Sequence, residues 1–443
     1  MSETDPMNVN ERRKYLHKVR IRYMKTKGRA EKSRMLEEVV AVTGLHRKSV
    51  LRLLHGELVR KPRRKQRGSS YGSEVTDAVR AIARSLDYPC AERLQPNLVW
   101  MADVLVAHQE LVLSAGVREK LGQVSVSTVR RMVPPDISKP ERVASRQRTQ
   151  AAAKHIPANI PMRRIPNQEP QPGHFEVDLV HHCGISASGQ YVHTLQMTDV
   201  TTGWCEPVAT LGRSYLVMQD GFEHIQQRLP FSILELHPDN GSEFLNDLML
   251  HFWRKQVAQA SLSRSRPYHK NDNRFVEENN SSLVRAYLGY QRLDTITQTT
   301  LLNQLYNKLW LYHNFFQPVM RLTEKITDAS THRIKRVYGT PLPPFDRLCQ
   351  AGVLSPEKEQ RLRSLRNATN PCSLRQEIHA LINQLFAQPN APDGIPEDVH
   401  QTLGLWKSGQ NSTAHFSTDP TTSTPKGADL SVTLSFERTI AVR

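Results

Sequence analysis

The stretch from His174 to Tyr290 decides the fold, and it opens with the segment His174-Phe175-Glu176-Val177-Asp178-Leu179-Val180. Apolar side chains at every second position alternate with Glu176 and Asp178, a period of two that is typical of a β-strand. Because successive side chains of a strand point to opposite faces, Asp178 is expected on one face while Val177 packs on the other.

Two more acidic segments follow, His237-Pro238-Asp239-Asn240-Gly241-Ser242-Glu243-Phe244 and Lys270-Asn271-Asp272-Asn273-Arg274-Phe275-Val276-Glu277-Glu278-Asn279. An apolar run over 231–236 predicts a strand that ends in turn-forming residues, so a loop is expected to aim Asp239. Asn273 or Asp272 is expected to cap a helix whose first turns carry Glu277.

Asp178, Asp239 and Glu277 are interpreted as ligands of divalent metal. Hard cations take oxygen ligands, and three carboxylates suit two ions roughly 3.5–4 Å apart that promote phosphoryl transfer. A lone Asp in a strand or turn is usually a solvated cap, but the three segments in this order favour the metal site. The role of Glu176 remains open: it is either a fourth metal ligand or a salt-bridge partner. The role of His237 also remains open, since its side chain either contacts the metal-bound water or the reacting phosphate, or only packs.

These motifs resemble the catalytic core of the DDE transposases and retroviral-type integrases, most closely that of bacterial insertion-sequence transposases. The resemblance covers His174 to Tyr290 and rests on Glu176-Val-Asp178, Asp239-Asn-Gly-Ser-Glu-Phe244 and Lys270-Asn-Asp-Asn-Arg-Phe-Val-Glu277. It implies an RNase H-like fold, a catalytic triad of Asp178, Asp239 and Glu277, and two Mg²⁺ or Mn²⁺ ions. The superfamily's glutamate usually follows a small apolar residue, here Val276, which favours Glu277 over Glu278.

The charge of the chain is strongly uneven. Its 443 residues hold 60 Lys and Arg against 43 Asp and Glu, a net charge of +17. Residues 1–70 contain 20 basic and 7 acidic side chains, whereas residues 174–290 contain 9 basic and 13 acidic ones. An acidic core with a basic flank indicates a polyanionic partner, here double-stranded DNA.

The basic N-terminal segment predicts a helix-turn-helix unit. Helices are expected over 11–27 and 32–42, followed by a glycine turn and a short basic helix over 46–55. Arg47, Lys48 and Arg52 of that last helix are predicted to contact DNA, although an ordinary helical hairpin is the alternative. The basic linker over 60–67, with Arg63, Arg64 and Lys65, is predicted to follow phosphates or to act only as a flexible joint.

The whole pattern predicts a multidomain chain: N-terminal α-helical helix-turn-helix units, a central α/β RNase H-like core with a mixed five-stranded sheet, and a helical C-terminal region. The expected parts are a helix-turn-helix unit (1–67), a second helical unit of the same kind (74–135), a Pro-rich basic linker (136–173), the catalytic core (174–295), a helical region (296–405) and a disordered tail (406–443). Within the core, further DNA contacts are expected from Arg264, Arg266, Lys270 and Arg285.

The cysteines Cys90, Cys183, Cys205, Cys349 and Cys372 form no closely spaced pair, which indicates reduced thiols. No signal peptide or membrane span is expected, so a bacterial cytoplasmic protein associated with the nucleoid is predicted. The predicted function is a DNA transposase that cleaves and joins DNA as a homo-oligomer. The alternatives are a catalytically silent DNA-binding regulator derived from a transposase and a simple RNase H-like nuclease.

Overall fold

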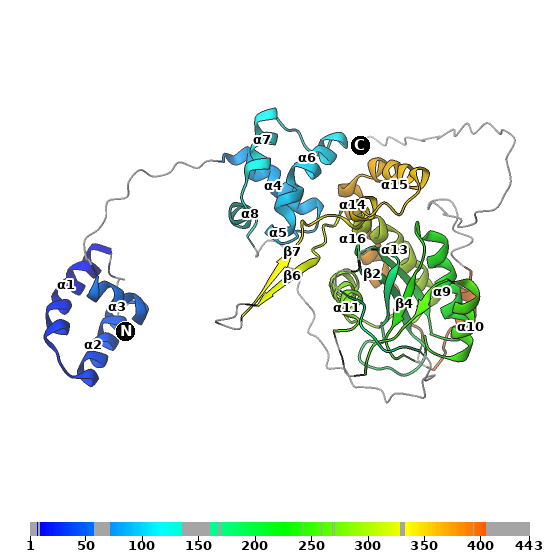
Figure 1. The fold of residues 1–443 in the computed structure, drawn as a ribbon, viewed down its shortest axis with the longest axis horizontal. Helices are drawn as coiled ribbons and strands as arrows, with labels where there is room; N and C mark the ends of the chain where they lie inside the picture. The colour runs from blue at the N-terminus through cyan, green and yellow to red at the C-terminus, as the bar shows by residue number, and fades with distance from the viewer. Residues whose placement is uncertain are drawn as a thin grey trace. The chain divides into compact units, whose positions relative to one another are not determined.

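The computed structural model describes residues 7, 9–56, 71–134, 160–166, 169, 171–241, 243–257, 259–267, 269, 271–327, 333–392 and 394–404. The chain forms two compact units, Met1–Ser70 and Tyr71–Arg443 (Figure 1). Lys270, Arg63, Arg64, Lys65 and the predicted tail over 406–443 lie outside the described residues.

The first unit is a bundle of three helices, α1 (Val9–Lys25), α2 (Arg29–Thr43) and α3 (Arg47–His55). Its small core contains Leu16, Leu36, Val50 and Leu54, which the helical spacing of apolar residues brings to the inside. Gly44 ends α2 with a φ of 66°, a left-handed conformation that favours glycine, and its N–H donates to the Val40 carbonyl. Helix, glycine turn and basic helix follow in the predicted order, and the assignment as a helix-turn-helix remains a prediction.

The second unit is built on a five-stranded sheet in the order β3-β2-β1-β4-β5. The strands are β1 (His174–His181), β2 (Val192–Asp199), β3 (Cys205–Leu211), β4 (Glu235–Pro238) and β5 (Ser261–Leu262). The first three pair antiparallel, whereas β4 runs parallel to β1 and β5 parallel to β4. The mixed five-stranded sheet confirms the predicted core architecture and is consistent with an RNase H-like core.

Strand β4 is shorter than the apolar run over 231–236 predicts, because it begins only at Glu235, and β5 contains only Ser261 and Leu262. Phe231 is buried because its ring stacks on Phe175, with centroids 5.6 Å apart, and not because it pairs in the sheet. Side-chain burial therefore explains the apolar residues that precede β4.

Helices cover both faces of the sheet (Figure 1). On one face, Gly221 of α9 (Tyr215–Arg228) lies close to Leu195, and α10 (Asp247–Gln256) packs beside α9. On the opposite face lie α11 (Arg274–Asn279), the π-helix η3 (Asn280–Arg285), α12 (Ala286–Leu288) and α13 (Ile296–Phe316). Tyr306 of α13 forms a hydrogen bond with Thr194 there. Asp178 is on this second face.

The second helical unit shares the core of the sheet-bearing unit. It contains α4 (Ser73–Ser85), α5 (Ala91–Leu94), α6 (Leu98–Ala107), α7 (Ala115–Gln123) and α8 (Val126–Met132), with the short 3₁₀ turn η1 (Gln95–Asn97). Tyr312 of α13 donates to the Ser85 carbonyl at 2.7 Å, and Trp100 stacks on Phe316. Gly122 lies inside α7, and the chain turns at Val124 and Ser125 before α8.

The C-terminal region is helical, as predicted, with one exception. After α13 come α14 (Pro344–Gln350), α15 (Pro356–Ala368), α16 (Pro371–Phe386) and the short η4 (Val399–Thr402). Between α13 and α14, however, β6 (Leu322–Thr327) and β7 (Ile334–Tyr338) form a two-stranded antiparallel hairpin that projects from the body in Figure 1. Its β-branched residues favour a strand. No helix within the described ranges is both long and apolar enough to cross a membrane.

Candidate active site

The parallel pairing of β1 and β4 brings two of the predicted catalytic residues to one place. Val177 of β1 is opposite Pro238 of β4 in the parallel register. The next residues along the two strands, Asp178 and Asp239, therefore come side by side at the same end of the sheet. Asp239 lies in the loop after β4, where one of its carboxylate oxygens accepts the Gly241 N–H at 2.9 Å. A Cβ atom at Gly241 would lie 2.8 Å from that carboxylate oxygen and 2.9 Å from the carboxyl carbon of Glu243, so a larger residue would require these side chains to shift.

The third predicted residue, Glu277, is in α11, and a buried carboxylate fixes that helix to β1. Glu176 accepts the N–H groups of Phe275 and Val276 at 2.6 and 3.0 Å, and it pairs with Arg274 at 3.6 Å. Burial raises the pKa of Glu176 to about 7, although the Arg274 charge and the two backbone donors oppose the rise. Glu176 is therefore a salt-bridge partner and a helix cap, one of the two roles left open by the sequence.

Asn273 occupies the N-cap position of this helix, as expected, but makes no side-chain capping hydrogen bond. Asp272 instead accepts two hydrogen bonds from the Arg266 guanidinium, at 2.8 and 2.9 Å. The orphan N–H groups at the start of α11 are satisfied by Glu176, which is about a hundred residues away in sequence, so local capping rules could not identify it.

Asn280 links the Glu277 helix to Asp178. Its side-chain amide donates to an Asp178 carboxylate oxygen at 2.6 Å. Asn280 follows Glu277 by three residues, so the two lie on neighbouring turns of one helical face. The bond falls where α11 passes into the π-helical turn η3, a type of irregularity that is frequent at functional sites. The sequence analysis missed Asn280, and its spacing from Glu277 was the available signal.

The two adjacent glutamates of α11 have different surroundings. Both glutamates are exposed, and Glu278 also pairs with Arg93 of α5 at 3.1 Å. The choice of Glu277 over Glu278 remains a prediction from the sequence.

The donor chemistry of the site fits a hard divalent cation, because its side chains offer carboxylate oxygens. Among the described residues, no group of three or more His, Cys, Asp or Glu side chains lies close enough to hold a metal ion by itself. Mg²⁺ commonly binds one or two carboxylates together with water and substrate phosphates. The strand register brings Asp178 and Asp239 to neighbouring positions, and the helix of Glu277 is bonded to Asp178 through Asn280, so these are the residues that could hold such an ion.

The predicted DNA-contacting residues fall into two groups. Arg47, Lys48 and Arg52 of α3 are exposed, and so is Arg266, which also pairs with Asp272. By contrast, Arg264 is buried and donates to the Ile160 carbonyl and to Asn240. Arg285 is half-buried and donates to the carbonyls of His181 and Gly289. Both of these arginines support the protein's own backbone, and their contact with DNA stays a prediction.

His237 is a packing residue. Its side chain is fully buried and forms hydrogen bonds with Ser263 and Ser265 at 2.7 and 3.3 Å. Burial lowers its pKa to about 4, so the ring is neutral at pH 7. These contacts connect β4 to the segment around β5 and leave His237 a supporting role behind Asp239.

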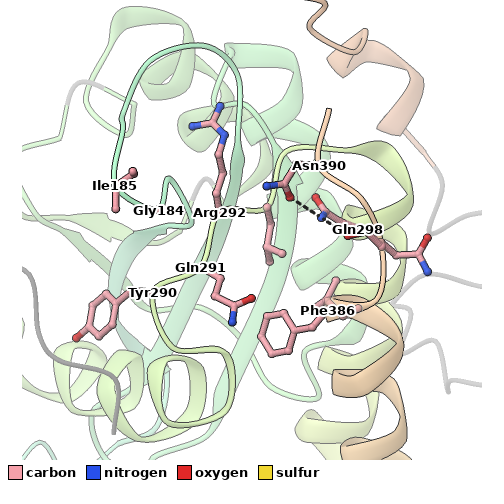
Figure 2. Close-up of a pocket in the computed structure, with 11 residues that line it drawn as sticks. Gly184, Ile185, Tyr290, Gln291, Arg292, Gln298, Phe386 and Asn390 are labelled. Atoms are coloured by element: carbon pink, nitrogen blue, oxygen red, sulfur yellow. Dashed lines mark hydrogen bonds between the residues drawn. The ribbon is translucent and has the colours of Figure 1, made fainter. Parts of the chain in front are cut away.

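A pocket of about 420 Å³ lies elsewhere in the same unit (Figure 2). Ile185 of the β1–β2 loop, Tyr290 and Phe386 are among its lining residues, and the Gln298 amide donates to Asn390 at 3.1 Å on one side. The lining contains none of the predicted catalytic carboxylates, so this pocket is separate from the candidate active site.

Comparison with known proteins gives one close relative. The chain is 36% identical over 320 residues to the uncharacterized protein y4rM of Sinorhizobium fredii, which spans 72% of this chain and 90% of the relative. The chain belongs to the y4rM family. No family model matches the chain. Membership in this family assigns no activity, because the relative is itself uncharacterized.

Solved structures similar to part of the chain are retroviral integrases. They include the catalytic core domain of BIV integrase (16% identity, TM-score 0.25, 33% of this chain and 85% of that one) and the HTLV-2 integrase catalytic core in complex with magnesium (16%, 0.26, 34% and 91%). An intasome of simian T-cell lymphotropic virus is similar over 49% of this chain and 69% of that one, at 12% identity and a TM-score of 0.28. No residue role is transferred from these structures.

Proposed function

We propose that this chain is a DNA transposase of the DDE integrase type, which cleaves DNA at the ends of an element and joins the freed 3′ ends to target DNA. The observation that carries the proposal is the joint placement of the predicted residues. Parallel strands set Asp178 beside Asp239, and the helix of Glu277 is tied to the same strand through Glu176 and Asn280. Three motifs separated by up to about a hundred residues thus come together at one end of the neighbouring strands β1 and β4.

In this proposal Asp178, Asp239 and Glu277 hold two Mg²⁺ or Mn²⁺ ions. When bound, such ions activate the attacking oxygen and stabilise the leaving oxygen of an in-line displacement. The chain's own task is positioning: β1 and β4 fix the two aspartates, Asn280 orients Asp178, and Glu176 fixes the start of α11. Such preorganisation suits phosphoryl transfer, in which the protein contributes geometry and charge neutralisation.

Delivery of DNA is assigned to the basic N-terminal unit. Arg47, Lys48 and Arg52 line the exposed side of α3 and are proposed to contact the element ends. The basic segment with Arg63, Arg64 and Lys65 is proposed to add phosphate contacts that carry no sequence information. Joining two ends to one target requires at least two active sites, so the working form is proposed to be a homo-oligomer on DNA.

The test is a strand-transfer assay with full-length protein, Mg²⁺ and duplexes that carry the element's own genomic ends. Joined product from end-bearing duplexes, and not from scrambled ones, is the expected result. Cleavage without joining would identify an RNase H-like nuclease instead. Specific binding to ends without cleavage or joining would identify a DNA-binding regulator, and absence of DNA binding would remove all three functions.

A further inference from the structure

The hairpin formed by β6 and β7 is exposed on both faces. Five of six residues in β6 and four of five in β7 are exposed. They include the large apolar residues Ile326, Tyr338 and Ile334, and the relative exposure of Ile334 is 59%. A two-stranded hairpin is marginally stable by itself in water, because it has no hydrophobic face to bury. A ribbon of this kind is stabilised when a partner covers it.

The side chains of the hairpin indicate the charge of that partner. Lys325 is directly opposite Arg336 in the antiparallel register, so two positive side chains face each other across the strands. Like charges in such a pair destabilise the ribbon. Lys335 lies on the opposite face together with Glu324, so the excess positive charge is on the face of Lys325 and Arg336. The ion pairs among the described residues include none of these three cations.

The base of the hairpin is anchored beside the candidate active site. Arg321, the residue before β6, lies over the Phe275 ring of α11 at 4.1 Å and donates to the Asp199 carbonyl at 3.2 Å. Val319 and Leu342 close the base through two backbone hydrogen bonds of 3.0 and 3.3 Å. Phe275 precedes Glu277 by two residues, so the ribbon starts next to the helix that carries the predicted catalytic glutamate.

We propose that the β6–β7 hairpin is a DNA-binding ribbon that contacts the phosphate backbone of duplex DNA next to the active site, with Lys325 and Arg336 as its main cations. Six extended residues reach roughly 20 Å, and a two-stranded ribbon fits the major groove of a duplex. Phosphates would neutralise the repulsion between the two side chains, which makes a polyanion the matching partner. The proposal rests on the proposed function, since it gives the DNA substrate a second contact surface.

The test uses the full chain with Lys325→Ala and Arg336→Ala combined, and a labelled random duplex of about 30 base pairs. Because each lost phosphate contact removes about 0.9 from the slope of log K against log salt, the slope should become shallower by up to roughly 2. Affinity at low salt should fall by roughly tenfold or more. The matched control is Arg254→Ala with Lys255→Ala, two exposed cations in the last turn of α10, which should change the affinity less than threefold.

Several results would overturn the proposal. They are an unchanged affinity and slope, an equal loss in the control, or no binding of duplex DNA by the wild type. A fourth is loss of self-association in sedimentation without DNA while binding per protomer is unchanged, which would make the hairpin a subunit contact. Strand transfer at saturating DNA separates this proposal from the proposed function. If the wild type never joins DNA but the hairpin variant still binds it more weakly, the proposed function alone is wrong.

Discussion

The central sheet is antiparallel in part and the β6–β7 hairpin is wholly antiparallel, yet the two have opposite surroundings. Every residue of β2 and β3 is buried, whereas nearly every residue of the hairpin is exposed. The sheet gains stability from burial on two faces, and the hairpin from its backbone ladder and its anchored base. A buried sheet suits the precise placement of reacting groups. An exposed hairpin suits contact with a large polyanion.

The largest expected effect concerns the predicted catalytic carboxylates, which are positioned by the buried central sheet. Asp178→Asn, Asp239→Asn or Glu277→Gln should each lower strand transfer by roughly 10³-fold or more, because a carboxylate ligand contributes several kcal/mol to metal-assisted transfer. The affinity for duplex DNA, measured by anisotropy, should change less than twofold. The hairpin variant, by contrast, is expected to weaken DNA binding.

Glu278→Gln is the matched control for these variants. It breaks an exposed pair with Arg93 that is worth at most about 1 kcal/mol, so transfer should stay close to wild type. Near-normal joining by Asp239→Asn in Mg²⁺ would refute the active-site assignment.

The second prediction compares packing in the two regions. Leu195→Ala removes a fully buried side chain of β2 and should reduce the free energy of unfolding by about 2–5 kcal/mol. Ile334→Ala removes an exposed side chain of β7 and should change it by less than about 0.5 kcal/mol. Urea unfolding of both variants measures the difference, and similar losses would mean that the hairpin is covered by the protein itself.

The third prediction separates positioning from ligation at Glu176. Glu176→Ala leaves two buried N–H groups of α11 without an acceptor and should cost about 1–3 kcal/mol of stability together with most strand transfer. Glu176→Gln keeps an acceptor oxygen and should restore transfer at saturating DNA to within about tenfold of wild type. A glutamine variant with normal melting but no transfer would instead indicate a metal ligand.

The smallest effect concerns a cluster in which charges are compensated, unlike those of the hairpin. Asp87 accepts hydrogen bonds from Tyr287 and Arg375 at 2.7 and 2.6 Å, joining the end of α4 to α12 and α16. Burial raises the pKa of Asp87, but hydrogen bonds with His379 and Tyr287 and the Arg375 charge outweigh it, so the pKa falls from 3.8 to about 2. Asp87→Asn should therefore cost about 2 kcal/mol at pH 7.

The pH dependence of this variant follows from the sign of the shift. A carboxyl group whose folded pKa is depressed contributes fully above its unfolded pKa and loses that contribution as pH falls toward the folded pKa. The difference between wild type and Asp87→Asn should thus shrink between pH 4 and pH 2. Urea unfolding at pH 7 and pH 3 measures it, and an equal difference at both values would contradict the charge-based role of Asp87.

Much of the core was predictable because its strands have the apolar alternation that burial requires. The same alternation located Asp178 on one face of β1, and the turn residues after β4 located Asp239. The hairpin was missed because its Lys, Arg and Thr residues face solvent and leave no apolar period to detect. Glu176 and Asn280 were not assigned their roles because their partners are about a hundred residues away, and only the folded register brings them together.

The shared core of α4–α8 and the sheet has a consequence for modularity. Met1–Ser70 is a separate unit with its own small core, so under the proposed function we predict that replacing this unit as a whole changes which DNA ends are recognised. The α4–α8 helices cannot be exchanged in this way, because Ser85, Asp87 and Trp100 are bound to α12, α13 and α16. Related chains should therefore differ by whole-unit replacement before residue 70 and by gradual, compensated substitution after it.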